Sequence, residues 1–95
     1  MSGGIEVLSR RIEIQNAIGL HARPAAMIAA EASKHRSQIL LRCGSCAADA
    51  KNSIRVLALA VNSGDCVELV VSGEDEEYAL ACLDGVFQII NSSNC

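Results

Sequence analysis

Aromatic residues are scarce in this chain of 95 residues, which contains no Trp, one Tyr and one Phe. Because 51% of the residues are nevertheless apolar, the core must be aliphatic, built from Leu, Ile, Val and Ala. A chain of this length forms one domain around one core. We therefore expect a single domain over residues 1–95, with 1–6 as a short N-terminal extension and 91–95 as a polar tail.

Long apolar runs are also missing, so the sequence predicts no segment that crosses a membrane. Residues 1–4 lack the charged and apolar regions of a signal peptide. A formal net charge of −3 argues against nonspecific binding to nucleic acid. These absences predict a cytoplasmic protein with no membrane insertion and no nucleic-acid partner.

The five cysteines do not indicate a disulfide framework, because their number is odd and no secretory signal accompanies them. Cys43 and Cys46 have CxxC spacing, but no second pair or nearby histidine completes a structural zinc site. We expect reduced cysteines at a hairpin tip, with Cys66 and Cys82 in the core and Cys95 exposed. No metal site and no cofactor are expected. The alternative is a small metal or redox protein that uses Cys43 and Cys46.

Hydrophobic periodicity and turn signals predict both strands and helices. Apolar or alternating segments predict four strands, at residues 8–14, 38–42, 46–50 and 66–71. Helical spacing predicts three helices, at residues 22–34, at about 53–61 and from about 72 to 90. Ser72 and Asp75 have the spacing of a capping box for the last helix. One sheet can cover all three helices, so we expect a two-layer α+β domain.

The most distinctive stretch is residues 19–26, Gly-Leu-His-Ala-Arg-Pro-Ala-Ala. Pro24 is the only proline, and proline is tolerated in the first turn of a helix. A helix should therefore begin near Ala22, with His21 at its cap and Arg23 beside it. Free amides, the helix dipole and an arginine form an anion site, so His21 could carry a phosphoryl group. A capping or solvent-facing histidine is the alternative, and we interpret His35 as a surface residue.

Seven consecutive residues, Gly-Leu-His-Ala-Arg-Pro-Ala, resemble the active-site signature of the HPr family, the phosphocarriers of the phosphoenolpyruvate-dependent phosphotransferase system. The resemblance extends from about residue 8 to residue 90. It implies an open-faced sandwich of four antiparallel strands with three helices on one face, in the order β-α-β-β-α-β-α. It also implies a monomer that carries phosphoryl groups and is not a turnover catalyst.

The resemblance implies a role for each residue of the site. His21 would be phosphorylated on Nδ1 by enzyme I and would pass the group to an enzyme IIA-type acceptor. Arg23 would pair with the phosphoryl oxygens, and the backbone amides of Ala22 and Arg23 would add donors. The alternative function is a regulatory HPr-like module that acts through its phosphorylation state rather than in sugar transport.

Many HPr proteins carry a regulatory serine, following a lysine, thirty-one residues after the histidine. Here that position is Asn52, following Lys51, and Ser53 comes one residue later. An ungapped alignment, which we favour, leaves a helix cap that an HPr kinase/phosphorylase cannot modify. A shift of one residue would instead place Ser53 there. The Asn-Ser-Ile sequence also resembles the Asn-Ser-Val of the nitrogen-branch phosphocarriers.

Partner docking in this family uses the surface around the histidine and exposed apolar and basic residues at the second helix. An exposed apolar patch with a basic rim suits transient binding to acidic partners. By position, the docking residues implied here are Lys51, Ile54, Arg55 and Leu57.

Overall fold

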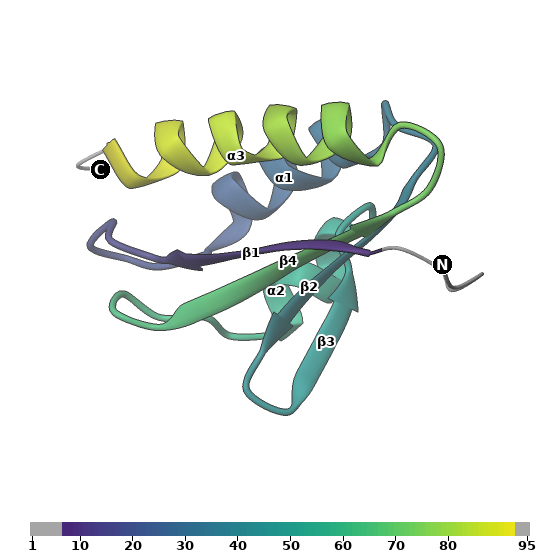
Figure 1. The fold of residues 1–95 in the computed structure, drawn as a ribbon. Coiled ribbons are helices and arrows are strands. Elements are labelled where there is room, and N and C mark those ends of the chain that lie inside the picture. Colours follow the sequence, from purple (N-terminus) through teal and green to yellow (C-terminus); the bar gives the residue numbers. More distant parts are fainter. Residues whose placement is uncertain (1–6, 93–95) are drawn as a thin grey trace.

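The computed structural model describes residues 7–92, which form one sheet and three helices (Figure 1). The order of elements is the predicted one. The elements are β1 (Leu8–Glu13), α1 (Ala22–Ala32), β2 (Gln38–Cys43), β3 (Cys46–Asp49), α2 (Ser53–Ala58), β4 (Cys66–Ser72) and α3 (Glu76–Ser92). Residues 1–6 and Cys95, for which the sequence made predictions, lie outside the described residues.

The sheet has the strand order β1-β4-β2-β3, and every neighbouring pair is antiparallel. Burial alternates along its two central strands: Leu69 of β4 and Leu41 of β2 are fully buried, whereas Arg42 is exposed on the opposite face. One face therefore packs against the helices, and the other is open to solvent. In Figure 1, α1 and α3 lie above the sheet, and α1 also contacts α2. This arrangement confirms the predicted open-faced α+β sandwich.

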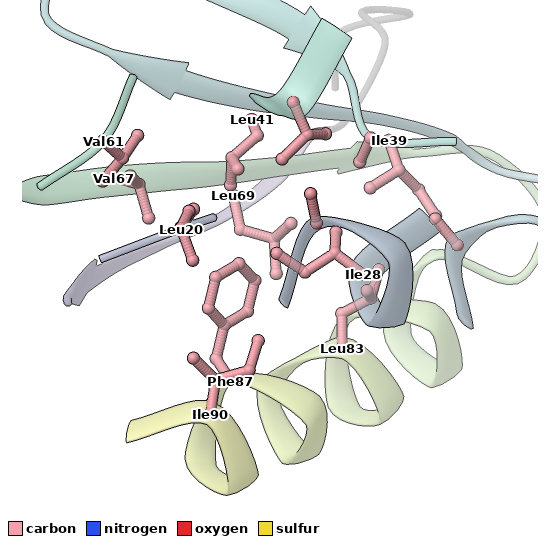
Figure 2. Close-up of a cluster of buried hydrophobic side chains, with 14 of the residues drawn as sticks. Leu20, Ile28, Ile39, Leu41, Val61, Val67, Leu69, Leu83, Phe87 and Ile90 are labelled. Atoms are coloured by element: carbon pink, nitrogen blue, oxygen red, sulfur yellow. The ribbon is translucent and has the colours of Figure 1, made fainter. Parts of the chain in front are cut away.

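The core is aliphatic with one exception, the Phe87 ring on α3. Figure 2 shows this ring pointing from α3 toward the sheet, near Leu20 of the loop before α1. Phe87 is 1% exposed, whereas Tyr78, the other aromatic residue, is exposed. Within residues 7–92, no helix combines the length and apolar character needed to span a membrane.

The predicted capping box of Ser72 and Asp75 is wrong, because Ser72 is the last residue of β4 and α3 begins at Glu76. The Asp75 carboxylate instead accepts hydrogen bonds from the backbone N–H groups of Arg36 (3.0 Å) and Ser37 (2.9 Å) and from the Ser37 hydroxyl. These hydrogen bonds hold the pKa of Asp75 well below its usual range, and the bond from the Ser37 hydroxyl has the largest effect. Asp75 thus fastens the chain after α1 to the start of α3.

The interpretation of His35 as a surface residue is also wrong. His35 is 6% exposed, because α1 ends at Ala32 and the imidazole in the following turn packs between Glu31 of α1 and Tyr78 of α3. Its Nε2 lies 2.8 Å from Glu31 Oε2, and its ring meets the Tyr78 ring edge to face at 5.4 Å. These partners satisfy a polar ring that would otherwise be costly to bury.

Two further predictions need correction. Cys66 is exposed rather than part of the core, because it lies on the open face of the sheet; Cys82 is half-buried. The predicted polar tail is helical up to Ser92. Its Asn91 side chain accepts from the Gln15 N–H and donates to the Glu13 carbonyl, both at 2.9 Å, and so joins the end of α3 to the end of β1.

Cys43 and Cys46 face each other at the end of the β2–β3 hairpin, as expected, and are free thiols. Burial raises the pKa of the Cys43 thiol, and the nearby Asp65 adds to this effect. A raised pKa disfavours the thiolate that redox and metal-exchange chemistry require. The hairpin therefore offers little support for the alternative of a redox protein.

Candidate functional site

His21 is the N-cap residue of α1, with an extended backbone (φ −90°, ψ −166°). Its carbonyl accepts the first helical bond from the Ala25 N–H at 3.0 Å, while its imidazole makes no capping hydrogen bond with the described part of the chain. Pro24 is buried in the first turn. The prediction of a helix that begins at Ala22 with His21 at its cap is confirmed, and the half-buried ring remains available for chemistry.

The loop that carries His21 is fastened to the segment after α2 by backbone hydrogen bonds. The Leu20 N–H donates to the Val61 carbonyl at 3.0 Å, and the Ile14 N–H donates to the Asp65 carbonyl at 2.9 Å. Gly19 completes the turn with φ +84°, a conformation that suits glycine. The position of His21 thus depends on contacts far along the chain.

We expect Gly19→Ala to destabilise the protein more than Gly64→Ala. Both glycines have a left-handed backbone, so either substitution should cost about 1–2 kcal/mol. A Cβ at Gly19 would also lie 2.4 Å from the Val61 carbonyl oxygen, whereas one at Gly64 meets nothing within 4 Å. The clash should add about 1–3 kcal/mol. Urea unfolding of both variants measures the difference in the free energy of unfolding. Equal losses of stability would contradict a close approach of Gly19 to the Val61 carbonyl.

A groove of about 350 Å³ lies beside His21, between the start of α1 and the end of α3. Its walls combine exposed apolar residues, Ile18 and Ile89, with the polar residues His21 and Arg23. Asn16 also lines it; its amide nitrogen donates to the Gly19 carbonyl at 3.1 Å, and its buried Oδ1 has no partner among residues 7–92. A molecule in this groove could therefore meet an imidazole and a cation.

Asn16 was missed by the sequence analysis. An asparagine three residues before a glycine is an ordinary turn pattern, so it carried no functional signal. The only available sign was its place in the short loop that ends at His21.

The start of α1 has the electrostatics of an anion site. The first turn contains no acidic residue to offset the positive end of the helix dipole. The amides of Ala22 and Arg23 belong to the first turn, where backbone N–H groups have no helical acceptor. The Arg23 side chain is exposed beside them. An imidazole next to these donors can hold a tetrahedral anion whose oxygens they bind.

Asn52 is the N-cap of α2, as the ungapped alignment predicts. Its side-chain oxygen accepts from the backbone N–H groups of Ile54 (3.1 Å) and Arg55 (3.2 Å). Ser53 is the first residue of the helix. The capping role of Asn52 is confirmed, while a regulatory role for either residue stays a prediction.

The predicted docking residues do not all lie near His21. Lys51 Nζ donates to the His35 carbonyl at 2.9 Å, just beyond the far end of α1. An α-helix rises about 1.5 Å per residue, so the 11 residues of α1 separate this contact from His21 by roughly 16 Å. Ile54 (76% exposed), Arg55 and Leu57 (43% exposed) are accessible on α2, and their docking role stays a prediction.

A comparison with protein families matches residues 8–88 to the family described as "PTS HPr component phosphorylation site". The phosphocarrier protein HPr of Treponema pallidum is 39% identical over 79 residues, which cover 83% of this chain and 90% of that protein. The HPr-like protein Crh of Bacillus subtilis is 34% identical over 82 residues, covering 86% and 96% of the two chains.

The fold has solved counterparts. HPr-C-His from Thermoanaerobacter tengcongensis superposes with a TM-score of 0.85 at 35% identity, covering 93% of this chain and 99% of the other. The histidine-containing phosphocarrier protein of Mycoplasma gives a TM-score of 0.86 at 27% identity, with coverages of 88% and 96%. Sequence, fold and the histidine at the start of α1 agree, and the chain therefore belongs to the HPr family of phosphocarrier proteins of the phosphotransferase system.

Proposed function

We propose that this protein accepts a phosphoryl group on Nδ1 of His21 from phospho-enzyme I and passes it to an enzyme IIA-type acceptor. The observation that carries the proposal is the His21 imidazole, which caps no amide and stands at a helix start with no acidic residue in its first turn. The likeness to HPr of Treponema pallidum supports the same role.

The transfer exchanges one phosphorus–nitrogen bond for another. The unprotonated Nδ1 of His21 attacks the phosphorus, and the imidazole of the donor leaves with the electron pair of the broken bond. Arg23 and the amides of Ala22 and Arg23 hold the phosphoryl oxygens during the step. In a second exchange of the same kind the acceptor attacks the phosphorus, and Nδ1 of His21 leaves with the electron pair of the broken bond. The protein is thus a carrier in the cytoplasm rather than a turnover catalyst.

Incubation with phosphoenolpyruvate and enzyme I tests the proposal. We expect the mass of one phosphoryl group, which acid removes and alkali does not, as for a phosphoramidate. Addition of an unphosphorylated enzyme IIA should remove the label and leave it on the acceptor. Absence of label with an enzyme I that phosphorylates another HPr protein in the same assay would contradict the carrier function.

A regulatory module is the second candidate function, and the relationship to Crh of Bacillus subtilis favours it. Crh is an HPr-like protein and is also called the catabolite repression HPr of Bacillus subtilis. The two functions differ at the last step. A carrier loses its label to an enzyme IIA, whereas a purely regulatory module keeps it.

The protein is proposed to act as a monomer, since the site needs residues of one chain only. Relatives show that the family also forms dimers. HPr of Thermoanaerobacter tengcongensis has been solved as a dimer, and Crh of Bacillus subtilis as a dimer with a swapped domain.

A further inference from the structure

Three potential metal ligands, from two helices and a turn, converge at the end of α1 that lies farthest from His21. Glu31 is on α1, His35 is in the turn that follows, and Cys82 is on α3. One ligand atom of each residue lies within 4.8 Å of the other two. Figure 1 shows how this arises, because the end of α1 lies beside the first turns of α3.

The His35 ring is oriented as a metal-binding imidazole requires. Its Nε2 lies 2.8 Å from Glu31 Oε2, and its Nδ1 lies on the side of Asp75, 3.6 Å from Oδ2. Asp75 is itself held by Ser37 and by the Arg36 backbone. A carboxylate near the second ring nitrogen is the usual support of a metal-bound histidine, and a small shift of the ring would bring Nδ1 within hydrogen-bond distance of Asp75.

The other two groups are chemically suited to the same ion. Glu31 supplies a carboxylate whose Oε2 already lies beside the His35 ring, 2.8 Å from Nε2. Lys34, whose ammonium lies 3.6 Å from Glu31, has a largely exposed side chain that can move away. Cys82 is half-buried and free, within reach of a small ion.

We propose that Glu31, His35 and Cys82 bind a zinc ion, at a site separate from the phosphoryl site. One thiolate, one imidazole and one carboxylate are borderline and hard ligands that zinc accepts in tetrahedral geometry. Three protein ligands leave the fourth position for water. Binding displaces the proton between His35 and Glu31 and the thiol proton of Cys82, and both protons pass to the solvent.

Modest movement would complete the site. Tetrahedral zinc with bonds of about 2.0–2.3 Å places its ligand atoms roughly 3.3–3.8 Å apart. The ligand atoms already lie within 4.8 Å of one another, so side-chain rotations suffice. The bound ion would join α1 to α3 and should stabilise the folded state.

Cobalt(II), added alone to the intact reduced protein, is the spectroscopic probe. We expect one equivalent to bind, with an absorption band of thiolate-to-cobalt charge transfer that zinc removes by displacement. Cys82→Ser and Cys82→Ala should lose the band, and Glu31→Gln should weaken binding by at least about tenfold. Zinc should raise the unfolding temperature of the wild type and leave that of Cys82→Ser unchanged.

The hairpin thiols supply the matched control. A double variant, Cys43→Ser with Cys46→Ser, should keep the cobalt band and the zinc-induced thermal shift, because both thiols lie outside the cluster. A band that disappears in this variant or persists in Cys82→Ser overturns the proposal, as does its absence from the wild type. His21→Ala should bind cobalt normally, so failure of the carrier function and failure of this site are distinguishable.

Discussion

His21→Ala is expected to accept no phosphoryl group from enzyme I and to unfold at the wild-type temperature. Both parts follow from the cap geometry. The imidazole makes no capping bond with the described residues, while the backbone carbonyl that begins α1 is unchanged by the substitution. Substitutions of half-exposed side chains without such partners usually change the free energy of unfolding by less than about 0.5 kcal/mol.

The second histidine, His35, is an internal control for the His21→Ala experiment. The chain has two histidines, and His35 remains intact in the His21→Ala variant. Its ring is buried and contacts Glu31, so enzyme I should not reach it. Intact-mass measurement after reaction with phosphoenolpyruvate and enzyme I gives the result, and circular dichroism gives the unfolding temperature. Any acid-labile label on the variant would assign the carrier site to another residue.

Phe87→Ala should destabilise the protein by about 3–5 kcal/mol, a large part of the roughly 5–15 kcal/mol that holds a domain of this size folded. Phe87 is 1% exposed and is the only aromatic side chain in the core of the described residues. The labelled side chains around it in Figure 2 are aliphatic, so no neighbouring ring could fill the cavity that the substitution leaves.

Ile89→Ala is the matched control for Phe87→Ala. Ile89 lies two residues away on the same helix but is 60% exposed, so its truncation should cost less than about 0.5 kcal/mol. Urea unfolding of the two variants measures the contrast. A loss of less than about 1 kcal/mol for Phe87→Ala would show that the core does not depend on the ring.

The sequence predicted the features that arise from neighbouring residues. Pro24 and the short glycine-histidine stretch located the start of α1, because a proline fits only the first turn of a helix. The turn signal Gly44-Ser45 between two strand-like segments indicated a hairpin, and the register, with Cys43 opposite Cys46, confirms it. Each prediction depended on residues within a few positions of one another.

The sequence failed where a side chain is used by a distant segment. Asp75 follows Ser72 at capping-box spacing, yet its carboxylate binds the backbone at Arg36 and Ser37. Asn91 looked like part of a polar tail, yet it binds the backbone at the end of β1. Local patterns cannot show which distant backbone groups need a partner, so these roles became visible only in the fold.

The position of β1 at the edge of the sheet has a consequence for folding kinetics. It pairs with β4, Leu8 opposite Val71 and Glu13 opposite Cys66, so its contacts have high sequence separation. Long-range pairing slows folding, because the intervening chain loses loop entropy before the strand is bound. The loop that carries His21 follows β1 and is fastened to Val61 and Asp65. Nascent or partly unfolded chains should therefore be poor phosphoryl acceptors, and a phosphorylation assay should count only fully folded molecules.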